Sequence, residues 1–202
     1  MRMIHIAFEG IDNSGKTTLA DALLEYLLEK WVRVALTKEL TTPVACIIKD
    51  AFAKGIHLGG RMKTYLFAAD RLERYESLVR REQENGKPYL VIWDRYVYSA
   101  IAYRAAEGID PEWVQMVNSL FPLANQGYYL DVTSEESIRR GSESGKPCPY
   151  SQGFLARVRE NYSSMVEKGT LNVIAGVTQA ELLLNVILDI ETGRTMGSHL
   201  KY

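Results

Sequence analysis

The segment that most constrains the fold is GIDNSGKT at residues 10–17, which lies between a strand pattern and a helix pattern. Residues 3–8 (MIHIAF) form an apolar run typical of a buried strand, and leucines recur on one face of a predicted helix at 17–30. The eight residues match G-x-x-x-x-G-K-[ST], a loop whose backbone N–H groups surround phosphate at the start of a helix. The segment therefore predicts a strand, a phosphate-binding loop and a helix in succession.

This loop predicts a nucleoside triphosphate as the ligand. Lys16 is placed to reach the β and γ phosphates of ATP, and the hydroxyl of Thr17 is placed to bind Mg²⁺. The alternative is a chance match in an unrelated glycine turn. We expect the following residues to bind ATP: Gly10, Ile11, Asp12, Asn13, Ser14, Gly15, Lys16, Thr17 and Thr18.

A second group of functional residues follows the apolar run LVIWD at 90–94. Asp94 ends this predicted strand, a position from which a carboxylate can bind Mg²⁺ directly or through water, and Arg95 offers a cation beside it. The alternative is that Asp94 caps a helix or forms a surface ion pair. We predict Thr17 and Asp94 as the metal ligands.

Apolar runs and helical patterns alternate along the rest of the chain. Further strands are predicted at 31–37, 88–94, 127–132 and 171–176, and a long amphipathic helix at 62–83. Parallel neighbouring strands need long crossover connections, which helices of this length provide. We therefore predict a three-layer α/β fold, with a parallel sheet of about five strands flanked by helices.

We expect residues 1–192 to form one domain, because 202 residues fit a single domain with insertions. Residues 141–153 (GSESGKPCPYSQG) are rich in Gly, Ser and Pro, and we expect a mobile lid there. The last residues, 193–202, show no periodicity and are expected to be a disordered tail.

Charge and composition limit the partners of the chain. The 24 Lys and Arg residues balance 25 Asp and Glu residues, so no nucleic-acid partner is expected from the overall charge. No apolar run approaches the roughly 20 residues of a membrane span, and a cytoplasmic location is expected. Cys46 and Cys148 belong to no CxxC pair, which supports neither a zinc site nor a disulfide. The sequence has no NKxD base-reading motif, which favours phosphoryl transfer to a small acceptor over a GTPase.

The chain resembles thymidylate kinases over nearly its whole length. The matching segments occur in the family's order: FEGIDNSGKTT (8–18), FAADR (67–71), DRYVYSAIAY (94–103), YYLDV (128–132) and FLARVRENY (154–162). The resemblance implies a P-loop kinase fold and the ATP- and Mg²⁺-dependent phosphorylation of dTMP to dTDP, in dTTP biosynthesis. It also implies a homodimer, for which the helix face at 62–80 is a candidate contact surface.

The resemblance assigns roles in acceptor binding. Phe67 would stack on thymine while Arg71, four residues further along the helix, holds its edge. Asp12 would accept a hydrogen bond from the 3′-hydroxyl, Tyr103 would crowd the 2′ carbon, and Arg95 would grip the acceptor phosphate. Core packing is the alternative for Phe67 and Tyr103. The acceptor-binding residues implied are Lys38, Glu39, Phe67, Arg71, Asp94, Arg95, Ser99 and Tyr103.

Two departures from the family pattern keep other acceptors open. Lys38, Glu39 and Leu40 stand where the family usually has Arg-Glu-Pro, and Ala100 replaces a polar residue that many relatives have. A kinase of dUMP, dCMP or thymidine is therefore an alternative, and a non-catalytic nucleotide-binding regulatory protein is another.

The loop carries Asn13 and Ser14 at positions where relatives can have an arginine, so we expect the lid to deliver a cation to the phosphates. Arg139 and Arg140 are the preferred candidates. The alternative is that both belong to a solvated helix surface. Lys146 is a further candidate, and Arg157 and Arg159 are weaker ones. The catalytic residues predicted are Lys16, Asp12, Arg95, Arg140 and Arg139.

Overall fold

The computed structural model describes the chain except for residues 1–2, 31–32, 84–88, 175, 177 and 193–202. The first residues of the strand predicted at 31–37 and the tail predicted at 193–202 lie outside the described residues. The elements in chain order are β1 (Met3–Glu9), α1 (Lys16–Glu29), β2 (Val34–Lys38), α2 (Ala45–Ala53), α3 (Gly60–Gln83), β3 (Tyr89–Asp94), α4 (Val97–Ala106), α5 (Pro111–Val117), β4 (Gln126–Tyr129), α6 (Ser134–Glu143), α7 (Gln152–Glu167), β5 (Asn172–Val173) and α8 (Gln179–Glu191).

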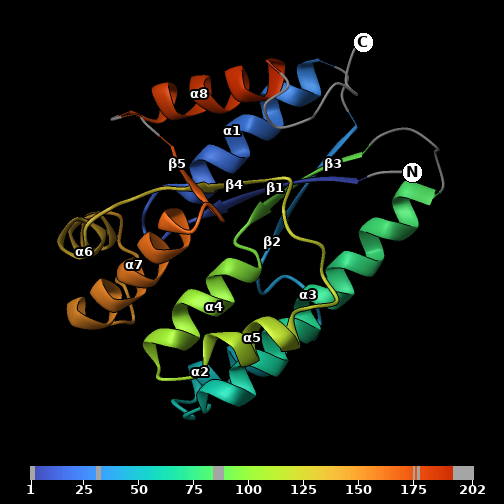
Figure 1. Ribbon diagram of the computed structural model, residues 1–202. Coiled ribbons are helices and arrows are strands. Elements are labelled where there is room, and N and C mark those ends of the chain that lie inside the picture. The colour runs from blue at the N-terminus through green and yellow to red at the C-terminus, as the bar shows by residue number, and fades with distance from the viewer. Residues whose placement is uncertain (1–2, 31–32, 84–88, 175, 177, 193–202) are drawn as a thin grey trace.

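The strands form one parallel five-stranded sheet in the order β2-β3-β1-β4-β5. From the central strand β1 the chain crosses first to β2 and β3 on one side, and later to β4 and β5 on the other (Figure 1). Open α/β sheets bind ligands at the carboxyl ends of their strands, where the connections diverge in this way. The predicted three-layer fold is confirmed, and β1 and β3 end side by side at this edge.

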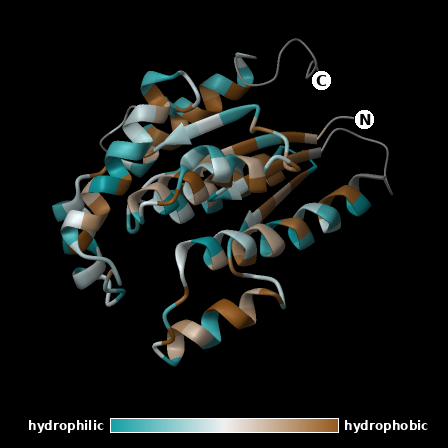
Figure 2. Cartoon of the chain, turned by 60° about the horizontal axis from the view of Figure 1, so that its bottom comes forward, coloured by the Kyte–Doolittle hydropathy of each residue, from teal (hydrophilic) through white to brown (hydrophobic). Residues whose placement is uncertain are grey.

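Alternate residues of β1 pack on opposite faces of the sheet. Ile4, Ile6 and Phe8 join one core with residues of α1 and α8, whereas Ala7 joins a second core with residues of α4 and α7. Figure 1 shows α1 and α8 on one side of the sheet and α3, α4, α5 and α7 on the other. The strands between them carry many hydrophobic residues (Figure 2), as strands covered on both faces require.

Two of the predicted strands are shorter in the structure. β4 ends at Tyr129, and β5 comprises only Asn172–Val173. The chain leaves β4 early because Thr133 caps α6, where its side chain accepts a hydrogen bond from the backbone N–H of Glu136. Helix α2 was not predicted.

The loop predicted at 141–153 is also shorter, because α6 continues to Glu143 and α7 begins at Gln152. Ser151 caps α7 by accepting a hydrogen bond from the backbone N–H of Phe154. Residues 144–151, called the lid below, connect the two helices. In the described part of the chain, no helix has the length and apolar character needed to cross a membrane.

Candidate active site

A pocket of about 420 Å³ opens at the carboxyl edge of the sheet, a volume suited to a small-molecule ligand. Most residues predicted to act on ATP, metal or acceptor line this pocket: Asp12, Asn13, Lys16, Thr17, Lys38, Glu39, Phe67, Asp94, Arg95, Ser99 and Tyr103. Six further residues that were not predicted from the sequence also line the pocket: Phe52, Lys63, Thr64, Arg104, Pro149 and Tyr150. The helical spacing could have found two of them, since Lys63 lies four residues before Phe67 and Arg104 four residues after Ala100.

The phosphate-binding loop has the backbone conformation that its glycines allow. Gly10, Asn13 and Gly15 have φ angles of 146°, 55° and 98°. A Cβ atom on Gly10 would lie 2.7 Å from the carbonyl oxygen of Leu130, so a side chain cannot be accommodated there. Gly15 precedes α1 and provides no side-chain cap. The first N–H groups of α1 are therefore left for an anion, and Thr18 lies exposed in this first turn.

Lys16 is buried at the base of the loop, and only 5% of its surface is exposed. Its Nζ donates hydrogen bonds to the carbonyl oxygen of Ile11 at 2.5 Å and to the Oγ of Ser14 at 2.9 Å. Burial lowers the pKa of Lys16 to about 7, and the nearby guanidinium of Arg95 contributes in the same direction. An anionic phosphate would counter both effects and favour the charged ammonium.

The two predicted metal ligands are in direct contact. The hydroxyl of Thr17 donates to Oδ2 of Asp94 at 2.6 Å, and Asp94 is buried. The Nζ of Lys38 lies 3.1 Å from Oγ1 of Thr17 and 3.3 Å from Oδ2 of Asp94. Asp94 does not cap α4, whose N-cap is Tyr96 without a side-chain hydrogen bond. The two oxygens therefore both face the ammonium of Lys38.

Arg95 connects the end of β3 to the phosphate-binding loop. Its backbone has a φ of 71°, and its Nη2 lies 3.0 Å from Oδ1 of Asp12. The hydroxyl of Tyr103 donates to Oδ2 of Asp12 at 2.6 Å, so both carboxylate oxygens are bound. Burial by itself raises the pKa of Asp12, but Arg95, Tyr103 and Lys16 outweigh burial and lower this pKa. Asp12 is therefore an anion that fixes Arg95 and Tyr103 in the pocket.

Behind this group lies a carboxylate that the sequence analysis missed. Glu9, the last residue of β1, is fully buried and accepts hydrogen bonds from the hydroxyls of Ser99 and Tyr162 and from the backbone N–H of Tyr96. Arg95 in turn donates to the Oγ of Ser99 at 3.4 Å. Ser99, predicted to bind the acceptor, lines the pocket while its proton is directed to Glu9. A polar residue ending an otherwise apolar strand was the available signal for Glu9.

The structure separates Phe67 from Arg71. Phe67 lines the pocket, but the guanidinium of Arg71 is fully buried, 2.6 Å from Oδ1 of Asn118 and 2.7 Å from Oε1 of Glu39. The cation nearest the Phe67 ring is instead Arg104, whose Cζ lies 6.0 Å from the ring centroid. Arg71 thus reaches the pocket only through Glu39, which lines it.

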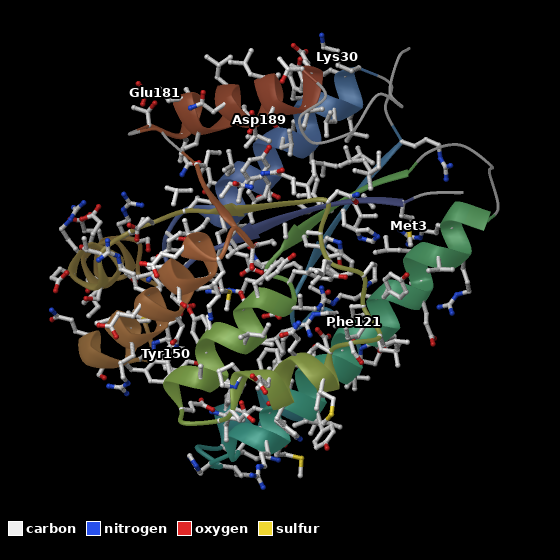
Figure 3. All side chains as sticks on the ribbon, viewed as in Figure 1. Met3, Lys30, Phe121, Tyr150, Glu181 and Asp189 are labelled. Atoms are coloured by element: carbon white, nitrogen blue, oxygen red, sulfur yellow. The ribbon has the colours of Figure 1, made fainter. Side chains whose placement is uncertain are left out.

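The predicted lid cations lie outside the pocket lining. The carboxylate of Glu136 binds Nε and Nη2 of Arg139 and Nε of Arg140, each at 2.7 Å. Arg139 also pairs with Glu143 at 2.6 Å. The lid reaches the pocket through Pro149 and Tyr150. Figure 3 shows Tyr150 between α4 and α7, where its ring contacts those of Tyr103 and Phe154.

The remaining cation candidates also lie outside the pocket lining. Lys146 is exposed in the lid. The guanidinium of Arg157 lies over the ring of Phe154, and Arg159 forms a two-pronged ion pair with Asp131. Arg159 is therefore engaged in holding α7 to the end of the sheet.

Comparisons with known proteins agree on one family. The family model described as thymidylate kinase matches residues 8–187. A probable thymidylate kinase of Pyrococcus abyssi is 37% identical over 175 residues, covering 83% of this chain and 84% of that protein. Another, of Pyrobaculum aerophilum, is 38% identical over 162 residues, covering 79% and 81%. The crystal structure of thymidylate kinase from Ehrlichia chaffeensis superposes with a TM-score of 0.74 at 25% identity, covering 94% of this chain and all of that one. The chain therefore belongs to the thymidylate kinase family and is a phosphotransferase.

Proposed function

We propose that this protein transfers the γ-phosphoryl group of ATP to dTMP, with Mg²⁺, and forms dTDP and ADP. The observation that carries the proposal is the convergence of Lys16 and Arg95 on one pocket, where Asp12 forms an ion pair with Arg95 and also favours the charged form of Lys16. One cation follows β1 and the other follows β3, so the sheet fixes the distance between a donor site and an acceptor site. Membership of the thymidylate kinase family supplies the identity of the acceptor.

The donor phosphates would bind the loop at 10–17. The N–H groups at the start of α1 and the ammonium of Lys16 are the charges placed to receive them. Lys16 would exchange its bonds to Ile11 and Ser14 for phosphate oxygens, and it would oppose the charge that develops during transfer.

Thr17 and Asp94 would hold Mg²⁺. Hydroxyl and carboxylate oxygens are the ligands this ion prefers, and the ammonium of Lys38 already stands in for a cation there. Among the described residues, no cluster of three or more His, Cys, Asp or Glu side chains could hold a metal alone, so phosphates and water would complete the shell. When bound, the ion would neutralise negative charge on the β and γ phosphates.

Arg95 would orient the phosphate of the acceptor, with Lys38 as a second cation. The acceptor oxygen is already anionic, so transfer needs no general base, and catalysis reduces to alignment and charge neutralisation. Phe67 would stack on the base, and Tyr103 would exclude a 2′-hydroxyl from the space beside its ring. Glu39, held by Arg71, and Ser99, held by Glu9, would complete the acceptor wall.

The lid would cover the bound nucleotides and exclude water, whose attack would hydrolyse ATP. Arg139 and Arg140 lie on the helix that leads into the lid, and their partly exposed ion pairs with Glu136 are weak enough to exchange for phosphate. A homodimer and a cytoplasmic location stay predictions from the sequence.

The test measures ADP release from ATP and Mg²⁺ with dTMP, dUMP, dCMP, dGMP or thymidine as the acceptor. We expect dTMP to give the highest kcat/KM. We expect Arg95→Met to lose this activity at least about a hundredfold, because the variant removes a preorganised cation. Arg80→Met, which truncates an exposed arginine of α3, is the matched control.

A higher kcat/KM for another acceptor would overturn the assignment to dTMP. The side chain at position 100 is the reason to include other bases in this test. Ala100 lines the pocket and offers no hydrogen bond to a base. ATP turnover without dependence on any acceptor would overturn the kinase proposal itself.

A further inference from the structure

The position of Lys38 sets up a competition at the metal site. Lys38 is the last residue of β2, and the parallel register pairs it directly with Asp94 at the end of β3. Paired residues of adjacent parallel strands direct their side chains to the same face of the sheet, so these two are brought together by the fold. The result is the contact of the Lys38 ammonium with both Oγ1 of Thr17 and Oδ2 of Asp94.

The ammonium and a metal ion cannot use these oxygens together. The hydroxyl of Thr17 donates its proton to Asp94 and accepts a hydrogen bond from Lys38, so the ammonium already uses the oxygen that a metal ion would bind. Mg²⁺ bound directly by both oxygens would lie 2.0–2.1 Å from each, which would leave the ammonium of Lys38 within a few ångströms of the ion. Lys38 must therefore leave when the metal binds.

The side chain of Lys38 is free to move within the pocket. Its side chain is 52% exposed, in contrast to 4% for Asp94, so only the ammonium end is held. Lys38 lines the same pocket as Arg95, the residue proposed above to orient the acceptor phosphate. A lysine suits such movement because its point charge sits on a flexible stem, whereas the planar fork of arginine would bind the carboxylate more rigidly.

We propose that the ammonium of Lys38 binds Thr17 and Asp94 in the metal-free protein and moves to the acceptor phosphate when the metal binds. Binding of the metal then increases the affinity of the protein for the acceptor. This proposal rests on the proposed function for the identity of the acceptor. It requires no rearrangement of the backbone, since the two positions of the ammonium belong to one side chain. By linkage, acceptor binding strengthens metal binding by the same factor.

The first experiment measures Mn²⁺ binding by electron paramagnetic resonance, with protein in excess over ADP and no acceptor present. We expect Lys38→Met to bind Mn²⁺ roughly two- to fivefold more tightly than the unaltered protein, the range spanned by the loss of one partly exposed ion pair. Lys38→Arg retains the competing charge, so its Mn²⁺ affinity should equal or fall below that of the unaltered protein. Lys54→Met is the matched control, because Lys54 forms an exposed ion pair with Asp50 away from the pocket.

The second experiment measures dTMP binding by calorimetry, with ADP alone and with ADP and Mg²⁺. We expect Mg²⁺ to tighten dTMP binding in the unaltered protein and in Lys54→Met, and to have a smaller effect in Lys38→Met. Equal Mn²⁺ affinity in Lys38→Met and the unaltered protein would overturn the competition. The same metal dependence of dTMP binding in both would overturn the transfer of the ammonium.

These outcomes are separable from a failure of the proposed function. Mn²⁺ binding is measured without any acceptor, so it tests Lys38 even if the enzyme prefers a different nucleotide. Lys38→Met could bind Mn²⁺ more tightly while none of the proteins binds dTMP. This result would support the competition between Lys38 and the metal, and it would refute dTMP as the acceptor and the movement of Lys38 to its phosphate. A lower melting temperature of Lys38→Met with unaltered Mn²⁺ affinity would assign Lys38 a role in holding β2 to β3 and overturn the proposal.

Discussion

Replacing Lys16 by Met should make the nucleotide-free protein more stable while abolishing its activity. Lys16 places an ammonium in a buried site, where the carboxylates of Asp12, Asp94 and Glu9 offset only part of the desolvation. Burial lowers the pKa of Lys16 to about 7 from the ordinary 10.5. Between these two pH values the unfolded chain binds one more proton at this position than the folded chain does. The free energy of unfolding therefore rises with pH through this window, and the destabilisation is complete below pH 7.

The structure sets the size of this effect. One pKa unit corresponds to about 1.4 kcal/mol, so the displacement of the pKa of Lys16 corresponds to about 5 kcal/mol of lost stability below pH 7. Met has a similar length and no charge, but it leaves the carbonyl oxygen of Ile11 and the Oγ of Ser14 without their hydrogen bonds. Each lost bond costs about 1 kcal/mol. A net gain of about 2–3 kcal/mol at pH 7 follows, and this gain should disappear at about pH 9 and become a loss at higher pH.

The assay is urea unfolding of the unaltered protein and of Lys16→Met at intervals from pH 6 to pH 10, without nucleotide. Other titrating groups are common to both proteins, so the difference between their unfolding free energies isolates Lys16. ATP should raise the melting temperature of the unaltered protein more than that of the variant. A stability difference that does not change with pH would refute the buried ammonium as its cause, and near-native turnover by the variant would refute the role of Lys16 in transfer.

The sequence predicted the elements whose signals are local. The glycine positions, the apolar run of β1 and the carboxylate at the end of β3 each depend on a few consecutive residues. In a parallel sheet the strand ends meet at one edge, so this information was enough to assemble Asp12, Lys16, Thr17, Asp94 and Arg95 around one pocket.

Contacts that depend on register or side-chain direction were beyond the sequence. The pairing of Lys38 with Asp94 is fixed by the alignment of β2 with β3, which no local pattern encodes. Arg71 was expected beside Phe67 on one helix face, but its guanidinium is held in the interior by Asn118 and Glu39, two partners distant in the sequence that helical spacing does not reveal.

Helix α2 escaped prediction because its largest apolar residues do not mark its buried face. Ala45, Ile48 and Ala51 form that face, whereas Ile47 and Phe52 are 59% and 49% exposed, so the large apolar side chains alone do not show the helical period. Phe52 lines the pocket, which gives at least one of these apolar residues a position against a ligand.

Three further predictions concern acid stability, sugar selection and the lid. The buried His5 accepts a hydrogen bond from Trp93 Nε1 at 3.0 Å, and burial lowers its pKa to about 4 from 6.5. Between these pH values the unfolded chain binds one more proton at this position than the folded chain does. The free energy of unfolding should therefore fall by about 3 kcal/mol as the pH decreases from 6.5 to 4. In urea unfolding, His5→Gln should remove this part of the dependence on pH. Tyr103→Ala should raise kcat/KM for the ribonucleotide relative to the deoxyribonucleotide, whereas Tyr103→Phe, which keeps the ring, should not; an unchanged ratio in Tyr103→Ala would assign the ring to packing. Replacing Arg139 and Arg140 together by Met should lower kcat more than it raises KM for dTMP, because a cation that engages phosphate chiefly in the transition state affects chemistry rather than ground-state binding. Both arginines are at present paired with glutamate at the surface, so their removal should leave the melting temperature nearly unchanged. An unchanged kcat in the double variant, measured where chemistry limits the rate, would show that the lid covers the site without supplying charge.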